Sequence, residues 1–361
     1  MTDLTPFPPL EHLEPDEFAD LVRKAIKRDP QAGAHPAIQS AISHFQDEFV
    51  RRQGEWQPAT LQRLRNAWNV FVRWCTHQGI PALPARHQDV ERYLIERCNE
   101  LHRNTLKVHL WAIGKTHVIS GLPNPCAHRY VKAQMAQITH QKVRERERIE
   151  QAPAFRESDL DRLTELWSAT RSVTQQRDLM IVSLAYETLL RKNNLEQMKV
   201  GDIEFCQDGS ALITIPFSKT NHSGRDDVRW ISPQVASQVH AYLQLPNIDA
   251  DPQCFLLQRV KRSGKAIDPE SHNALNGHHP VSEKLISRVF ERAWKALNHE
   301  TGPRYTGHSA RVGAAQDLLQ EGYSTLQVMQ AGGWSSEKMV LRYGRHLHAH
   351  TSAMAQKRRR S

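Results

Sequence analysis

The most informative stretch of the sequence reads YTGHSARVGAA, from Tyr305 to Ala315. If a helix begins near His308, then His308 and Arg311 project from one face of its first turn, because they are three residues apart. The imidazole and the guanidinium then lie beside the free backbone N–H groups of the helix start, an arrangement that binds anions. The small residues 313–315 let this helix pack closely against a neighbour. A histidine and an arginine at this spacing are also common on solvated helices, so the pattern by itself decides nothing about function.

The sequence around this stretch predicts a mostly helical domain with a small antiparallel sheet. A capping signature that begins at Ser158 opens the first helix. The nearly continuous apolar run 179–190 is typical of a buried helix. Two strand-like runs, 211–217 and 228–231, flank a polar stretch that contains glycine, and they predict a hairpin with a long tip. Helical periodicity predicts the remaining helices at 233–245, 281–298, 308–321, 324–331 and from 335 onward.

The N-terminal part of the chain predicts a separate helical bundle. Between residues 37 and 140, apolar residues recur every three or four positions and are interrupted by proline and glycine, which indicates four or five helices. Residues 1–36 are rich in proline and predict an arm with at most one helix. The segment 141–150 is almost wholly charged and is followed by Pro153. The predicted organisation is therefore mainly α, in five parts: an arm (1–36), a helical domain (37–140), a linker (141–153), a second domain (154–346) and a tail (347–361).

Length and charge narrow the class of protein. The chain has 361 residues, with 48 Lys and Arg against 39 Asp and Glu, a net charge of +9. This length fits two domains, and no apolar run approaches the ~18 residues of a membrane span. The acidic, proline-containing start does not resemble a secretory signal, so we expect a cytoplasmic protein without a membrane partner. A basic chain favours a polyanionic partner, although many ordinary proteins are also basic.

Cysteine and histidine spacing predicts neither disulfides nor a metal site. The five cysteines are an odd number, are widely spaced and include no CxxC pair, which favours free thiols in a reducing compartment. His346, His348 and His350 alternate, and this spacing does not bring three ligands together on one helix. We therefore expect no metal site among these residues.

Several single residues are ambiguous when each is taken separately. Arg191 follows the buried apolar run and needs a partner, which is either an internal carboxylate or a phosphate. Lys219 lies at the tip of the predicted hairpin, where a solvated lysine is the ordinary outcome. Trp334 follows two glycines at a helix end, and Tyr343 comes nine residues later, where a tyrosine usually serves packing.

Taken together, these residues resemble the active site of the tyrosine recombinases, also called phage integrases. The six positions occur in the family's order: Arg191, Lys219, His308, Arg311, Trp334 and Tyr343. Flanking stretches such as TLLR, which ends at Arg191, and MQAGGW, which ends at Trp334, resemble the Cre-like members in particular. The resemblance covers roughly residues 38–355. One departure is Asn194, which stands where relatives commonly carry a carboxylate, and it puts only a supporting hydrogen bond in doubt.

The residues of this set suit attack on a phosphodiester. Two guanidinium groups, from Arg191 and Arg311, match the non-bridging oxygens of an anionic phosphate. His308 and Trp334 can each donate a further hydrogen bond, and His308 can also accept a phenol's proton. The resemblance implies that Tyr343 forms a 3′-phosphotyrosine linkage, that Lys219 protonates the leaving 5′ oxygen, and that strand exchange follows without a metal or a nucleotide cofactor.

The partner that these residues imply is double-stranded DNA. Polar side chains away from the apolar stripes of two predicted N-terminal helices suit groove edges and phosphates: Gln62, Arg63, Arg65, Asn66, Asn69, Asn104 and Lys107. By resemblance, a groove-reading helix and a phosphate-contacting segment supply Lys284, Ser287, Arg288, Arg259, Lys261 and Arg262. A solvated face is the ordinary alternative for any one of them. The family clamps inverted-repeat half-sites between its two domains, with a dimer on one site and a tetramer in the synaptic complex, and residues 347–355 then dock into a neighbouring protomer through Met354.

Two other functions compete with recombination. A type IB topoisomerase shares the chemistry but relaxes supercoils as a monomer, and the short segment after Tyr343 favours recombination over it. A DNA-binding architectural protein that has lost catalysis is the non-enzymatic alternative. The presence of all six candidate residues argues against that second alternative.

Overall fold

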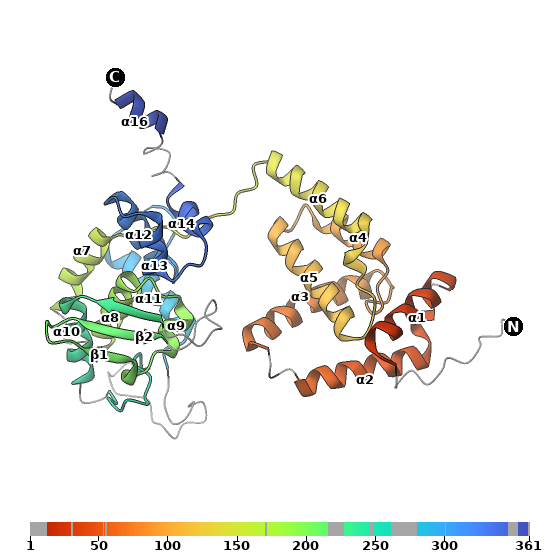
Figure 1. The fold of residues 1–361 in the computed structure, drawn as a ribbon, viewed down its shortest axis with the longest axis horizontal. Helices are drawn as coiled ribbons and strands as arrows, with labels where there is room; N and C mark the ends of the chain where they lie inside the picture. Colours follow the sequence, from red (N-terminus) through yellow and green to blue (C-terminus); the bar gives the residue numbers. More distant parts are fainter. Residues whose placement is uncertain are drawn as a thin grey trace. The chain divides into compact units, whose positions relative to one another are not determined.

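A computed structural model gives the fold of the chain (Figure 1). It describes residues 13–29, 32–52, 54, 56–169, 172–215, 227–245, 248–260, 280–299, 301–345 and 353–359. The chain divides into two compact units, Met1–Ile149 and Glu150–Ser361. The division falls inside the segment 141–153, which the sequence predicts as a linker.

The first unit is built from helices. They are α1 (Pro15–Arg28), α2 (Pro36–Arg52), α3 (Pro58–His77), α4 (His87–Arg97), α5 (Arg103–Ile119) and α6 (Arg129–Arg144), with short 3-10 turns at Ala32–Ala34 and Pro125–Ala127. Proline opens α1, α2 and α3 because its fixed φ suits the first turn and its missing N–H is not needed there. Gly79 follows α3 with φ of 66°, a left-handed conformation that glycine adopts without strain.

Two apolar clusters hold this unit together. Phe71 and Tyr93 lie at the centre of the larger cluster, where α3, α4, α5 and α6 meet. In the smaller cluster, Phe18 of α1 packs against Phe45 of α2, with ring centroids 5.3 Å apart. Residues 1–36 were expected to form an arm, and α1 is the one helix predicted there. Its apolar face is buried in the core of the unit, which the proline content of the segment did not reveal.

The second unit combines helices with a three-stranded sheet. Its helices are α7 (Glu157–Ser168), α8 (Val173–Glu187), α9 (Lys192–Gln197), α10 (Pro233–Leu243), α11 (Glu283–Ala296), α12 (Ser309–Gln320), α13 (Thr325–Gly332), α14 (Glu337–Tyr343) and α16 (Ala353–Arg359). A 3-10 turn at Val200–Asp202 precedes the strands β1 (Ile203–Phe205), β2 (Ala211–Ile215) and β3 (Asp227–Ile231). The mainly helical fold with a small antiparallel sheet is confirmed.

The sheet is antiparallel in the order β1-β2-β3. In its register, Ile213 of β2 pairs with Ile203 of β1 and with Arg229 of β3. Strands β2 and β3 form the predicted hairpin, while β1 was not predicted. The tip of the hairpin, residues 216–226, lies outside the described residues.

Helix α8 is the centre of the second unit. Every residue from Arg177 to Ala185 is buried, as expected of a helix that is covered on all sides. Its buried Asp178 accepts hydrogen bonds from the neighbouring Arg177 at 2.9 Å and from Arg292 of α11 at 2.8 Å, so the carboxylate does not stay unpaired. The predicted helix at 179–190 is confirmed in position, but α8 ends at Glu187 and a turn precedes Arg191.

Helix α12 is fixed in place by a close approach and by a polar network. The Ser309 carbonyl accepts a 3.0 Å bond from the Phe155 N–H, and a side chain at Gly313 would overlap the Phe155 carbonyl. Asp317 accepts hydrogen bonds from the Tyr186 hydroxyl at 2.7 Å and from Arg156 at 2.5 Å. The small residues of the stretch therefore allow the tight packing that the sequence predicts.

Two further observations concern membranes and thiols. Within the described ranges, every helix is too short or too polar to cross a bilayer. None of the five cysteines, all of which are described, forms a disulfide, and burial raises the pKa of Cys75, Cys126 and Cys254 to about 12. Such thiols are poor nucleophiles at neutral pH.

Candidate active site and DNA-contact faces

Arg311 connects three segments of the candidate active site. It lies in the first turn of α12 and is 3% exposed. One guanidinium nitrogen donates to the carbonyl of Leu189, and another donates to the carbonyl of Gly332 at 2.7 Å. Its Cζ atom lies 4.1 Å from the centroid of the Trp334 ring. A single side chain thereby fixes the turn before Arg191 and the loop that carries Trp334.

The turn between α8 and α9 places Arg191. Leu189 has φ of 49°, a left-handed conformation that costs a leucine of order 1 kcal/mol or more. The Arg311 bond to the Leu189 carbonyl helps to hold this conformation. Arg191 then caps α9 in an extended conformation and is half-buried. The nearby Asn194 of α9 is buried, and it interacts with its surroundings.

Trp334 and Tyr343 lie together beside Arg311. Gly333 has φ of 59° and ends α13, so that the Trp334 side chain turns inward and is 7% exposed. The centroids of the Trp334 and Tyr343 rings are 5.7 Å apart. Tyr343 is the last residue of α14 and stays half-buried, and its carbonyl accepts a 3.0 Å bond from Gln316 of α12. The tyrosine is thus anchored through its backbone while its phenol faces the buried cation.

His308 lies at the solvent-facing edge of the same group. It is the N-cap residue of α12 and keeps an exposed side chain. Loss of surrounding water in the crowded site, followed by the charges of Lys192, Arg311 and Arg191, lowers the pKa of His308. The imidazole is therefore neutral at pH 7, with one nitrogen able to donate and the other able to accept a proton.

The site concentrates positive charge. Burial lowers the pKa of Arg311 to about 9, with a further lowering from Arg191 and Arg229, while Tyr343 acts in the opposite direction. Arg311 still carries its charge at neutral pH. An anion placed among these side chains would relieve the repulsion between them, as a phosphate would.

Sequence reasoning missed Arg229. It is 7% exposed, and it pairs with Asp227 two residues earlier on β3 at 2.6 Å. Its guanidinium lies against Gly333, where a side chain would collide with it. The sequence does contain a signal for Arg229, because an arginine at an inward position of an alternating strand is unusual. The hairpin is thereby joined to the loop that carries Trp334.

Five of the six predicted catalytic residues are described, and Arg311 links them. Electrostatic interactions join it to Arg191 and His308, and its side chain contacts Trp334 and Tyr343. The sixth, Lys219, comes between β2 and β3 in the sequence and is outside the described residues.

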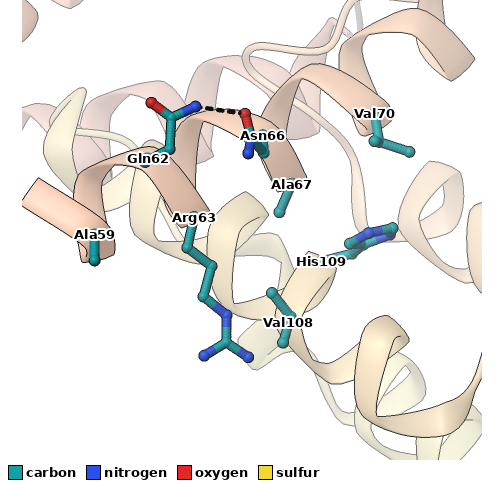
Figure 2. A pocket seen from close by; sticks show the side chains of 8 residues that line it. All are labelled: Ala59, Gln62, Arg63, Asn66, Ala67, Val70, Val108 and His109. Carbon is teal, nitrogen blue, oxygen red and sulfur yellow. Dashed lines mark hydrogen bonds between the residues drawn. The ribbon is translucent and has the colours of Figure 1, made fainter. Parts of the chain in front are cut away.

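The predicted DNA-contact residues of α3 form one exposed face. Gln62, Arg63, Arg65, Asn66 and Asn69 are all exposed, and none of them belongs to the buried stripe of the helix. A hollow of about 470 Å³ lies between this helix and Val108 and His109 of α5. Figure 2 shows the side chains that line it. The Gln62 side-chain amide donates to the Asn66 side-chain oxygen, Oδ1, at 2.8 Å, and this bond orients both side chains. Paired amides of this kind suit the donor and acceptor edges of bases.

The remaining predicted contacts are placed in part. Asn104 and Lys107 are exposed on α5. On α11, Lys284 and Arg288 are exposed and Ser287 is half-buried, and all three line a hollow of about 370 Å³. Ser287 also accepts a 3.3 Å bond from Lys192, which follows Arg191. Arg259 is exposed, while Lys261 and Arg262 lie outside the described residues.

Comparison with known proteins identifies the family. Residues 154–350 match the phage integrase family. The recombinase Cre of Escherichia phage P1 is 31% identical over 318 residues, 86% of this chain and 90% of Cre. An integrase/recombinase XerD homologue of Selenomonas ruminantium is 23% identical over 287 residues, 79% of this chain and 80% of its own length.

Solved structures share the fold. The Tn1549 transposon integrase in complex with circular intermediate DNA has a TM-score of 0.57 at 14% identity, over 89% of this chain and 99% of that chain. A lambda integrase dimer bound to a core site has a TM-score of 0.53 at 16% identity, over 84% of this chain and 94% of that chain. The chain therefore belongs to the phage integrase family, the site-specific tyrosine recombinases.

Proposed function

We propose that Tyr343 is the nucleophile of this recombinase and that Arg191, Arg311, His308 and Trp334 bind the scissile phosphate. The phenol oxygen attacks phosphorus, and the bond to the 5′ oxygen of the next nucleotide breaks. The product is a 3′-phosphotyrosine. The two guanidinium groups stabilise the charge that develops on the non-bridging oxygens in the transition state.

Proton transfers complete the step. Tyrosine phenols have a pKa of about 10 and are mostly protonated at neutral pH, so attack needs a base. The lowered pKa of His308 supplies a neutral imidazole for that task. Lys219 donates a proton to the departing 5′ oxygen. A 5′ hydroxyl from another strand then reverses the step and joins new ends, and the reaction needs no metal or cofactor.

The observation that carries this proposal is the position of Arg311. Its buried guanidinium interacts with Leu189, Gly332 and Trp334, and electrostatically with Tyr343. A structural arginine would be paired with a carboxylate at this depth. Among the described residues, Arg311 instead uses backbone carbonyls, pairs with no carboxylate and faces the phenol, which is the arrangement a phosphate-binding group requires.

The DNA partner is proposed to be a duplex site with inverted-repeat half-sites. Helices α3 and α5 of one domain (37–140) and α11 of the other (154–346) face the DNA, with the segment 141–153 as linker. A dimer occupies one site, and a tetramer forms the synaptic complex. The tail 347–361 docks into a neighbouring protomer through Met354, which is 64% exposed on α16. The proposed place of action is the cytoplasm, on the nucleoid.

A denaturing gel tests the nucleophile. The full chain is incubated with a DNA site that is nicked near the scissile phosphate, so that the cleaved strand escapes and the covalent adduct accumulates. We expect an adduct with the wild type and with Tyr323→Phe, a control at an exposed tyrosine, and none with Tyr343→Phe. An adduct with Tyr343→Phe would contradict the assignment.

A further inference from the structure

A second cluster of chemically active side chains lies in the first unit, separate from the proposed active site. His87 and Glu91 are four residues apart on α4, so they project from the same face of the helix. His128 is the N-cap residue of α6. One potential ligand atom from each of these three residues lies within 4.8 Å of the others.

The Glu91 carboxylate provides independent evidence for a ligand at this cluster. Its Oε1 atom is buried, and no hydrogen-bond donor reaches it among the residues that the structure describes. A buried carboxylate oxygen without a partner costs free energy, because it has lost its water and gained nothing in return. The Glu91 carboxylate interacts electrostatically with His87. A cation bound by this carboxylate would compensate for the lost water.

The nitrogen lone pairs of the two histidines do not yet point at one common position. Their rings stack with centroids 3.6 Å apart and an interplanar angle of 23°. Stacking keeps the nitrogen lone pairs of the two rings in nearly parallel planes, so one ring must turn about its Cβ–Cγ bond before both lone pairs reach the same ion. The His128 Nδ1 atom accepts a 3.4 Å bond from the Tyr130 N–H, which is long for a hydrogen bond, so little is lost if the ring turns.

We propose that His87, Glu91 and His128 form a zinc site that fastens α4 to the N-terminus of α6. Two imidazole nitrogens and one carboxylate oxygen are ligands that zinc accepts, with water completing a tetrahedron. The ligands come from two elements that pack together, so binding ties α4 to α6. The site stabilises the helical unit and takes no part in the proposed DNA chemistry.

Zinc titration of the full chain by calorimetry tests this site, after removal of metal with a chelator. Other histidines also bind zinc, so the number of zinc ions is compared between variants. The ligand variants are His87→Gln and His128→Asn, and asparagine retains the N-cap that His128 provides. His77→Gln, at the exposed end of α3, is the matched control.

We expect the wild type and His77→Gln to bind one more equivalent of zinc than either ligand variant. Zinc should also raise the Tm of the first two proteins and leave the Tm of the ligand variants unchanged. Equal stoichiometry in all four proteins would overturn the proposal. If circular dichroism shows that a ligand variant loses helix content, the zinc affinity of the isosteric variant Glu91→Gln is compared with that of the wild type instead. A loss of zinc affinity of ~10-fold or more supports the site, and unchanged affinity refutes it.

Discussion

At the scale of single residues, Arg311 explains why the candidate active site holds its shape. Its guanidinium presents donors in a fixed plane, so two of them reach the carbonyls of Leu189 and Gly332 while the face of the group lies against Trp334. A lysine has a single ammonium group and no planar face, so it cannot make these contacts together.

Arg311→Lys should therefore reduce the rate of strand cleavage by ~10²-fold or more, the usual effect of removing one group that stabilises an oxyanion. Adduct formation on the nicked site measures cleavage, and a gel-shift titration measures DNA binding, which should stay near the wild-type level. Arg162→Lys, at an exposed arginine of α7, is the control. Loss of both cleavage and binding would show that Arg311 serves folding and not chemistry.

The site could be predicted from the sequence only where residue type and order are distinctive. His308 and Arg311 share one helical turn, so their proximity follows from spacing. The contact between Arg311 and Leu189 does not, because it depends on a left-handed turn and on residues 122 positions apart. The cluster around His87 was missed for the same reason, because tertiary packing brings His128 to α4. The alternation of β3 marks Arg229 as inward, but the sequence does not show that it meets Gly333.

At the scale of elements, the backbone of α12 packs directly against the backbone of the segment before α7, and an added methyl group would prevent this contact. A side chain at Gly313 would overlap the backbone of Phe155, which cannot move aside as a flexible side chain can. The helix and the segment before α7 are therefore packed as closely as their backbones allow.

Gly313→Ala should lower the free energy of unfolding of the second unit by about 3 kcal/mol, at the upper end of the cost of overpacking. Thermal unfolding followed by circular dichroism measures the change. A methyl group at Gly54 would meet no atom within 4 Å, so Gly54→Ala is the matched control and should leave the Tm unchanged. An unchanged Tm in Gly313→Ala would mean that α12 is packed less closely than described.

His117 links α5 to the segment before α4 in its neutral form. Its Nδ1 bonds to the Ile113 carbonyl at 2.7 Å, and its Nε2 accepts from the Ala85 N–H at 2.8 Å. If Nε2 were protonated, its N–H would face the Ala85 N–H, and neither donor would have an acceptor there. Burial accordingly lowers the pKa of His117 to about 4, from an ordinary value of 6.5.

Between about pH 6.5 and pH 4, the unfolded chain binds a proton at His117 and the folded chain does not. Stability should therefore fall as the pH falls through this window, by about 3 kcal/mol from this group. Denaturant unfolding at a series of pH values measures it. His117→Gln should be less stable at pH 7 but lose less stability toward pH 4, and an identical slope in both proteins would contradict the assignment.

The helices were more predictable than the sheet and the arm. The apolar stripe of α3 repeats at Leu64, Ala67, Phe71 and Cys75, and such a period survives any tertiary context. Strand β1 lies at the edge of the described sheet and has three residues, too few for an alternating pattern. The packing of α1 depends on Phe18 meeting Phe45, a contact that periodicity cannot reveal.

At the scale of the whole molecule, both units present polar and basic helix faces, and the chain carries a net charge of +9. Each phosphate neutralised by a lysine or arginine releases counterions and steepens the salt dependence of binding by about 0.9 in log–log slope. Arg63→Ala should therefore reduce the slope by about 1, measured by fluorescence anisotropy over a range of salt concentrations.

Asn66→Ala is the uncharged companion on the same face of α3. It should weaken binding to the cognate site at every salt concentration and leave the slope unchanged, because an amide that reads a base edge displaces no counterion. A slope unaffected by Arg63→Ala would remove this face from the proposed DNA interface.

Locating the covalent bond itself tests directly whether Tyr343 is the nucleophile. The adduct formed on nicked DNA is digested with nuclease and with a protease that cleaves after glutamate, and mass spectrometry then finds the peptide that carries the nucleotide. We predict the peptide Lys338–Ser361, whose only tyrosine is Tyr343. A nucleotide on the peptide that contains Tyr323 or Tyr305, or on none, would contradict it.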